Sequence, residues 1–194
     1  MKGDQMLPGL LPLVGRRVSV EALSWRHLMP AWRIASSAGA REGWPLFGQA
    51  LSPEDFANRV WETGSVSCAL VSRHDDSTIG LIQGLAERPV DQTIDLAVMV
   101  DPELWGTGWP VEGVVLFIDW LFGSRNLRKI YLRAPARELT SRVGGFGGSM
   151  VEEARLAGHL VRADGVDDVV IWALYRESWA GDLVRWVLDR RRDG

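Results

Sequence analysis

The sequence predicts an α+β fold in which a mixed, mostly antiparallel sheet of six to seven strands is flanked by helices. Three observations predict it: segments with apolar residues at every second position, segments with apolar residues at helical spacing, and the order in which the two kinds follow one another. A run of strands followed by one helical crossover requires both antiparallel and parallel pairing. The length of 194 residues, 46% of them hydrophobic, suits one domain. We place this domain at residues 13–194, behind a flexible leader at 1–12.

The first half of the chain contains one strand, two helices and then three strands. Residues 16–23 alternate and predict a strand, and residues 25–38 have apolar side chains at helical spacing. Ser52, Pro53, Glu54 and Asp55 are typical of a helix start, with a capping hydroxyl, a proline and two acids. Strands are expected over 66–72, 78–86 and 93–100, the first two joined by the polar turn 74–77.

The second half begins with the most apolar predicted helix, residues 110–122. A strand over 128–134 follows, then a hairpin of strands 152–162 and 168–175 around Gly165. A last amphipathic helix is expected over 179–190, where Trp179, Leu183 and Trp186 could form part of the core or the seam of a homodimer.

Composition excludes several classes of function. A net charge of -3 argues against a nucleic-acid partner. The lone Cys68 excludes an internal disulfide and a thiolate zinc cluster. No apolar run reaches about 18 residues, so no membrane partner is expected, and the absence of a signal-peptide pattern makes a cytoplasmic location the expectation. His27, His74 and His159 lack metal-ligand spacing, so no metal is expected, and His159 is a minor candidate for a catalytic base.

The segment 98–113 is the most informative part of the chain. A strand leads into Gly106-Thr107-Gly108, and a helix begins directly afterwards. Two glycines allow successive N–H groups to surround an anion, and the helix N-terminus adds its dipole, an arrangement that suits a pyrophosphate. An ordinary tight turn between strand and helix is the alternative. The P-loop and the three-glycine dinucleotide motif are both excluded, because their lysine and third glycine are absent.

Residues 102–109 (Pro-Glu-Leu-Trp-Gly-Thr-Gly-Trp) and Glu112-Gly113 resemble the acetyl-CoA loop of the GNAT acyltransferase superfamily. The branch that includes ribosomal-protein N-terminal acetyltransferases is the most similar. Residues 13–23, 126–130, 151–156 and 165–174 resemble the first strand, the approach to the fifth strand and the final hairpin of that branch. The resemblance therefore extends from about Leu13 to Trp179 and implies the GNAT fold.

The resemblance also implies an acyl-CoA-dependent N-acetyltransferase, in which an amine attacks the thioester directly. Acetyl-CoA or another acyl-CoA would be the co-substrate, without a metal, and a small molecule or peptide would supply the amine. The implied contacts are backbone groups: Val98, Met99 and Val100 for pantetheine and the thioester oxygen, and Gly106, Thr107, Gly108, Trp109 and Val111 for the pyrophosphate.

Two catalytic residues are implied by position. Asp95 falls where relatives carry a carboxylate that acts as base, although it could equally be a strand residue facing solvent. Ser141 falls where a hydroxyl can face the departing sulfur, with a plain helix-surface serine as the alternative.

The chain departs from the family at Glu138, which replaces an asparagine, and in the glycine-rich segment 143–149. Glycines inside a helix cost about 0.5–1 kcal/mol each, so the helix expected there would be weak. Two further functions therefore stay open: a GNAT-like acyl-CoA-binding module with little or no turnover, and an acyltransferase that uses a carrier-protein thioester.

Overall fold

A computed structural model describes residues 11–37, 51–138, 150–162 and 165–179. The described strands form one sheet of eight strands in the order β1-β2-β3-β4-β5-β6-β8-β7. Their bounds are β1 Leu13–Val14, β2 Val18–Ala22, β3 Gly64–Ser72, β4 Thr78–Arg88, β5 Thr93–Val100, β6 Lys129–Pro135, β7 Met150–Arg162 and β8 Gly165–Tyr175. All neighbours are antiparallel except β5 and β6. The predicted fold class is confirmed, with β1 as a short strand that the alternation pattern did not indicate.

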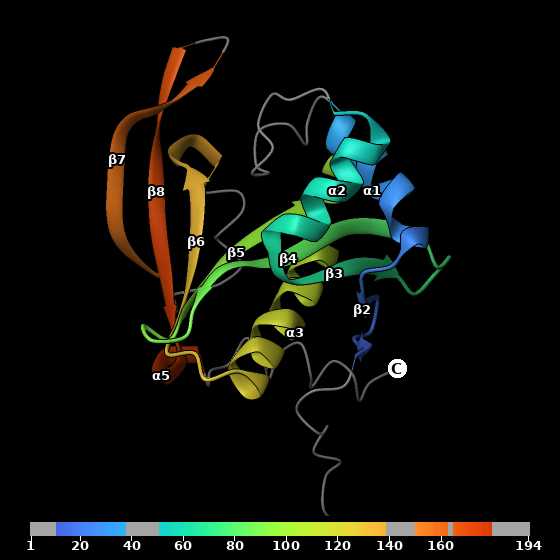
Figure 1. The fold of residues 1–194 in the computed structure, drawn as a ribbon, viewed down its shortest axis with the longest axis horizontal. Helices are drawn as coiled ribbons and strands as arrows, with labels where there is room; N and C mark the ends of the chain where they lie inside the picture. Colours follow the sequence, from blue (N-terminus) through green and yellow to red (C-terminus); the bar gives the residue numbers. More distant parts are fainter. Residues whose placement is uncertain (1–10, 38–50, 139–149, 163–164, 180–194) are drawn as a thin grey trace, which may run out of the picture.

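The described helices lie on both faces of the sheet (Figure 1). The bounds are α1 Trp25–Ser36, α2 Pro53–Thr63, α3 Trp109–Ser124, α5 Arg176–Trp179, and the short turns η1 Pro102–Leu104 and η2 Ala136–Glu138. The predicted helix start at Ser52 is confirmed, because its hydroxyl accepts a hydrogen bond of 3.1 Å from the Asp55 N–H. The helix expected over 179–190 and the glycine-rich segment lie outside the described residues, except for Trp179.

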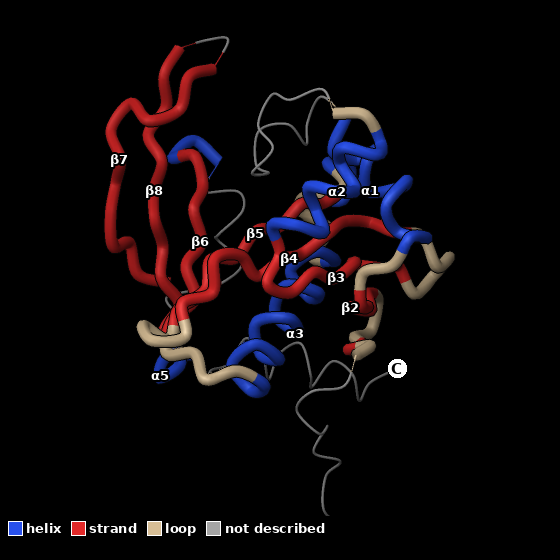
Figure 2. Tube along the Cα trace, in the orientation of Figure 1, coloured by secondary structure: helices blue, strands red, loops and turns tan. Residues whose placement is uncertain are grey.

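Two apolar cores follow from the alternation of side chains along the strands. On one face, α3 packs on Val18, Leu70, Ile82, Ile94 and Leu96. On the other face, α1 and α2 pack on Ala69, Val71, Leu81, Ala97 and Met99. We call these the α3 face and the α1–α2 face. Figure 2 shows the helices in blue on either side of the red strands.

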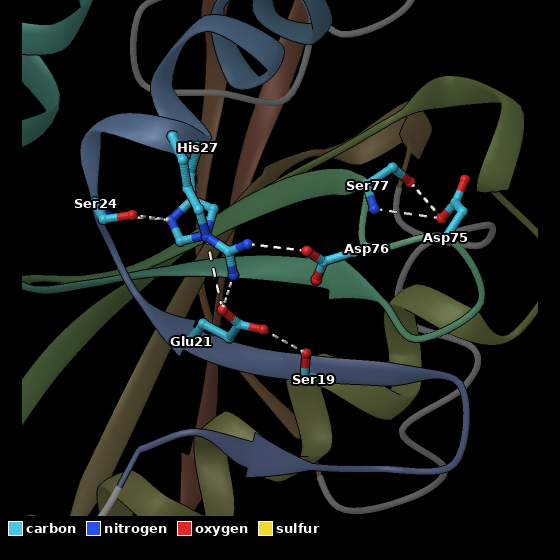
Figure 3. A network of polar contacts seen from close by, with 8 residues as sticks. Ser19, Glu21, Ser24, His27, Asp75, Asp76 and Ser77 are labelled. Atoms are coloured by element: carbon cyan, nitrogen blue, oxygen red, sulfur yellow. Dashed lines mark hydrogen bonds and ion pairs between the residues drawn. The ribbon is translucent and has the colours of Figure 1, made fainter.

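A polar network fixes the start of α1 against β2. The Glu21 carboxylate accepts a hydrogen bond of 2.9 Å from the Ser19 hydroxyl and forms an ion pair with Arg26, which also contacts Asp76 in the β3–β4 turn at 3.0 Å. His27 accepts a 3.1 Å hydrogen bond at Nδ1 from the Ser24 N–H, so the imidazole takes the part that a glutamate has in a capping box. Figure 3 shows Glu21 between Ser19 and His27. The strand, the helix and the turn are thereby held together.

Candidate active site

Strands β5 and β6 separate from each other halfway along their length. They pair in parallel from Thr93 and Lys129 as far as Leu96 and Leu132. Beyond these residues β5 pairs only with β4, and β6 pairs only with β8. The two halves of the sheet therefore diverge, with β6, β8 and β7 running upward on the left of Figure 1 and β3 to β5 running to the right.

A cavity of about 500 Å³ occupies the gap between the diverging strands. Most of its walls are apolar, and Asp95, Arg133 and His159 are the titratable side chains that line it among the described residues. The full lining is Leu85, Asp95, Leu96, Ala97, Val98, Trp105, Pro110, Val111, Val114, Ile118, Leu132, Arg133, Ala134, Pro135, Met150, Leu156, His159, Leu160, Val169 and Leu174. Such a site, apolar with a few convergent polar groups, is typical of small-molecule binding.

The cavity reaches both faces of the sheet. Leu96 and Val98 point to the α3 face and line the cavity together with Val111 and Val114 of α3. Asp95 is on the opposite phase of β5, next to Ala97, and so points to the α1–α2 face. Two reactants could therefore meet in the gap from opposite sides of the sheet.

The hydrogen-bond phase of β5 decides which backbone groups face the gap. The Asp101 N–H donates to the Ile79 carbonyl at 2.9 Å, and Met99 lies opposite Leu81 two residues earlier. In an antiparallel pair only alternate residues exchange hydrogen bonds. Met99 therefore turns its backbone groups toward β4, and its carbonyl oxygen lies against Gly80. Val98 and Val100 turn theirs the other way, into the gap. The contacts of Val98, Met99 and Val100 with pantetheine stay a prediction.

The loop before α3 has the conformation expected of an anion-binding turn. Gly106 and Gly108 both have φ of +82°, in the left-handed region that favours glycine. A Cβ at either position would meet no atom within 4 Å, so the backbone conformation and not crowding requires the glycines. Gly108 is the N-cap of α3, and Pro110 in the first turn has no N–H to satisfy.

Three of the five predicted N–H donors in this loop form no hydrogen bond with any described residue. In the described part of the chain, no hydrogen-bond partner is found for the N–H groups of Gly106, Gly108 and Val111. The Thr107 N–H donates to the Leu104 carbonyl at 3.2 Å, and the Trp109 N–H approaches the Thr107 hydroxyl at 3.4 Å. Three unsatisfied donors at a helix N-terminus form a site that attracts an anion.

Glu112 connects two distant segments of the chain, a structural role that its position in the sequence motif did not indicate. Glu112 is 8% exposed, and its carboxylate accepts hydrogen bonds from the backbone N–H groups of Arg16 and Arg17. It thereby fixes the β1–β2 turn to the first turn of α3. The same turn brings the Arg17 guanidinium to 6.0 Å from the ring centre of Trp109, beside the glycine loop.

Asp95 is bound between two arginines. Its Oδ2 lies 3.3 Å from Nη2 of Arg133, and its Oδ1 lies 3.7 Å from Nη1 of Arg88. The Oδ1 atom is buried and has no hydrogen-bond partner among the described residues, because 3.7 Å is too long for one.

A bulge in β7 places His159 at the cavity. Leu156 pairs with Val169 and Leu160 with Asp167, so three residues of β7 oppose the single residue Asp168. Gly158 makes this possible with φ of +56°, and its N–H donates to the Asp168 carboxylate at 2.8 Å. Bulges next to active sites often redirect a side chain. His159 was a minor candidate from sequence, since no local pattern showed that β7 bulges here.

The fold is similar to that of solved structures. A GCN5-related N-acetyltransferase from Brucella melitensis is similar over 95% of this chain and 86% of its own, with a TM-score of 0.73 at 16% identity. A spermidine N-acetyltransferase from Vibrio cholerae in complex with CoA and spermine is similar over 85% and 99%, with a TM-score of 0.73 at 15% identity. An acetyltransferase of the GNAT family from Bacillus anthracis is similar over 86% and 99%, with a TM-score of 0.70 at 12% identity.

The chain has the GNAT fold. A scan of protein-family models found no match, and neither did a search of curated proteins. In this fold the loop with Gly106 and Gly108 leads into α3, and Val111 of α3 lines the cavity together with Val98 of β5.

The remaining sequence predictions concern Ser141, Glu138, a metal site and a membrane-spanning helix. Ser141 lies outside the described residues, and of Glu138 only the backbone is described. Among the described residues no group of three His, Cys, Asp or Glu side chains could hold a metal ion. None of the described helices has both the length and the apolar character needed to cross a membrane.

Proposed function

We propose that this GNAT-fold chain is an acyl-CoA-dependent N-acyltransferase, in which an amine attacks the thioester directly. The observation that carries the proposal is the cavity through the sheet. It connects a loop with three free N–H donors on the α3 face to Asp95 on the α1–α2 face. A thioester bound from one side and an amine bound from the other would meet there.

The backbone of this chain would bind acyl-CoA. Gly106, Gly108 and Val111 would donate to the pyrophosphate, with Thr107 and Trp109 contributing if their present hydrogen bonds open. Val98 and Val100 would hydrogen-bond the pantetheine arm. The Arg17 guanidinium beside Trp109 adds positive charge at the loop.

The chemical step needs a base, a donor to the oxyanion and an acid. The amine nitrogen bonds to the thioester carbon, the C–S bond breaks, and the products are an amide and the CoA thiol. Asp95 or His159 would remove a proton from the incoming ammonium, and the Val98 N–H would stabilise the oxyanion. Ser141, proposed from its position in the sequence, would supply the proton to the departing sulfur.

The acceptor is proposed to be an amine on a small molecule or a peptide. The neighbour from Vibrio cholerae binds spermine, a small-molecule amine. The sequence resemblance to ribosomal-protein N-terminal acetyltransferases supports a peptide N-terminus instead. The cavity of about 500 Å³ has room for either a small amine or the end of a peptide.

The first test measures the melting temperature with acetyl-CoA and the release of thiol with a panel of amines. Ligand at about 100 times its Kd stabilises by roughly 2.7 kcal/mol. Burial raises the pKa of Cys68, the chain's one thiol, to about 12, so a thiol reagent detects released CoA with little background. Stabilisation with amine-dependent release supports the proposal, and stabilisation without release supports a binding module. No stabilisation contradicts both, and a preference for acetyl-pantetheine would favour a carrier-protein donor.

A further inference from the structure

A second hollow of about 450 Å³ lies on the α1–α2 face, at the closed end of the splay. Arg88 from β4, Arg128 before β6 and Arg133 from β6 contribute three guanidinium groups to its walls. The rest of the lining is Asp91, Thr93, Tyr131, Glu153, Ala154 and Ile171. Arg133 also lines the cavity between β5 and β6, so the two hollows adjoin at the Asp95–Arg133 ion pair.

A polar cluster adjoins this hollow, because Tyr131 and Glu153 of its lining both contact Lys129. Lys129 is 7% exposed, and its ammonium donates to Glu153 at 2.7 Å and to the Tyr131 hydroxyl at 3.2 Å. Tyr175 also donates to Glu153, so the two tyrosines of the chain both belong to the cluster. Burial alone would lower the pKa of Lys129, but the hydrogen bonds to Glu153 and the two hydroxyls outweigh it and raise that pKa. Lys129 therefore keeps its positive charge and neutralises the charge of Glu153.

Within the described part of the chain, each of the three arginines keeps N–H donors that no other group uses. Arg88 and Arg133 are about half exposed, and each contacts Asp95 through one terminal nitrogen. Arg128 uses its Nε to donate to the Asp91 carbonyl at 2.9 Å. A guanidinium carries five N–H donors in a fixed plane, which suits carboxylate and phosphate oxygens. The hollow and its immediate neighbours hold one more positive than negative charge. The four cations are the three arginines and Lys129, and the three carboxylates are Asp91, Asp95 and Glu153.

We propose that this arginine-lined hollow binds an anionic end of the acceptor, so that the substrate is an amine carrying a carboxylate or phosphate group. This inference rests on the proposed function. The amine would enter the cavity beside Asp95, and the anion would lie a few bonds away against Arg88, Arg128 and Arg133. A polyamine, whose distal groups are ammonium ions, would meet like charge there.

The experiment compares four amines of similar length as acceptors in the thiol-release assay with acetyl-CoA. They are 4-aminobutanoate, 3-aminopropyl phosphate, butylamine and 1,4-diaminobutane, which differ at the distal end in charge. We expect kcat/KM for at least one anionic amine to exceed that for butylamine by roughly tenfold or more, with the diamine lowest. Whichever anionic amine is faster identifies the head group as carboxylate or phosphate, and higher ionic strength should reduce the preference.

Variants locate the preference in the hollow. R128Q and R88Q should each lower the ratio of kcat/KM for the anionic amine to that for butylamine. Arg59 is an exposed arginine on α2 outside both hollows, and R59Q is the matched control that should leave the ratio unchanged. Equal or faster transfer to butylamine or the diamine, no transfer to either anionic amine, or an unchanged ratio in both variants would overturn the inference. A chain that acetyl-CoA does not stabilise would instead overturn the proposed function itself.

Discussion

Glu112 should be one of the most costly polar side chains to remove, although it lies beside the binding loop and not in the chemistry. Its carboxylate is nearly buried and accepts hydrogen bonds from the N–H groups of Arg16 and Arg17, 96 and 95 residues away. Removing it in E112A would leave two backbone donors at the β1–β2 turn without partners and would remove an acid from the first turn of α3.

The magnitude follows from these contacts. A hydrogen bond to a charged acceptor contributes about 1.5–3 kcal/mol, and the 3.2 Å contact to Arg17 belongs at the low end because it is long. An acid at a helix N-terminus adds about 0.3–1 kcal/mol. We therefore expect E112A to lower the free energy of unfolding by about 3–5 kcal/mol, which for a chain of this size lowers the Tm by roughly 6–20 °C. E112Q keeps an oxygen acceptor and should lose about half as much.

Urea denaturation followed by circular dichroism measures this loss directly. The matched control is E103Q, which changes an exposed acid in η1 and should alter the unfolding free energy by less than about 0.5 kcal/mol. A loss in E112A no larger than in E103Q, at an unchanged m-value, would refute the reasoning. The long-range hydrogen bonds would then not contribute to stability.

Three further predictions concern the loop, the start of α1 and the base. G108A should lower the free energy of unfolding by about 1–2 kcal/mol through its left-handed φ alone, and G108N by less, which paired denaturation curves would show. Burial and the charge of Arg26 lower the pKa of His27 in the folded state. The contribution of His27 to stability is therefore fully present above the unfolded-state pKa of about 6.5, and it declines as the pH falls below that value. H27Q should flatten this decline in melting curves, and an equally steep decline would contradict the assignment. The catalytic base is tested with D95N and H159Q, by measuring the pH profile of kcat/KM for each variant. Replacing the true base should lower kcat/KM about 10²–10⁴-fold. Small losses in both variants would exclude Asp95 and His159 as the base.

Local patterns were sufficient to predict most of the fold. The strand predicted over 93–100 has those bounds as β5, and the helix predicted over 110–122 is α3, Trp109–Ser124. The glycine loop was predicted from spacing, and its two left-handed residues are Gly106 and Gly108. These features depend on neighbours in the sequence, because strand alternation, helical spacing and turn conformation are all local.

The parts that sequence did not predict depend on contacts between distant segments. Glu112 meets Arg16 across 96 residues, and Glu153 meets Lys129 across 24, so neither pair leaves a periodic signal. His159 reaches the cavity through a bulge that depends on the register of β7 against β8. The backbone of β5 is the clearest case, because a shift of one residue along the strand decides whether a backbone group faces the gap or β4.

The start of α3 combines two tasks that make opposite demands on charge. A bound pyrophosphate would favour a bare helix N-terminus, whereas the fold needs the acid of Glu112 in the same turn to fix the β1–β2 turn. The two are separated in space: the carboxylate contacts the Arg16 and Arg17 N–H groups, while the free N–H groups of Gly106 and Gly108 belong to the exposed loop. The turn that Glu112 holds also carries the Arg17 guanidinium to Trp109, so the negative charge that fixes the turn brings a positive charge beside the loop. The anchoring of the fold would therefore support the proposed anion binding at the neighbouring glycines.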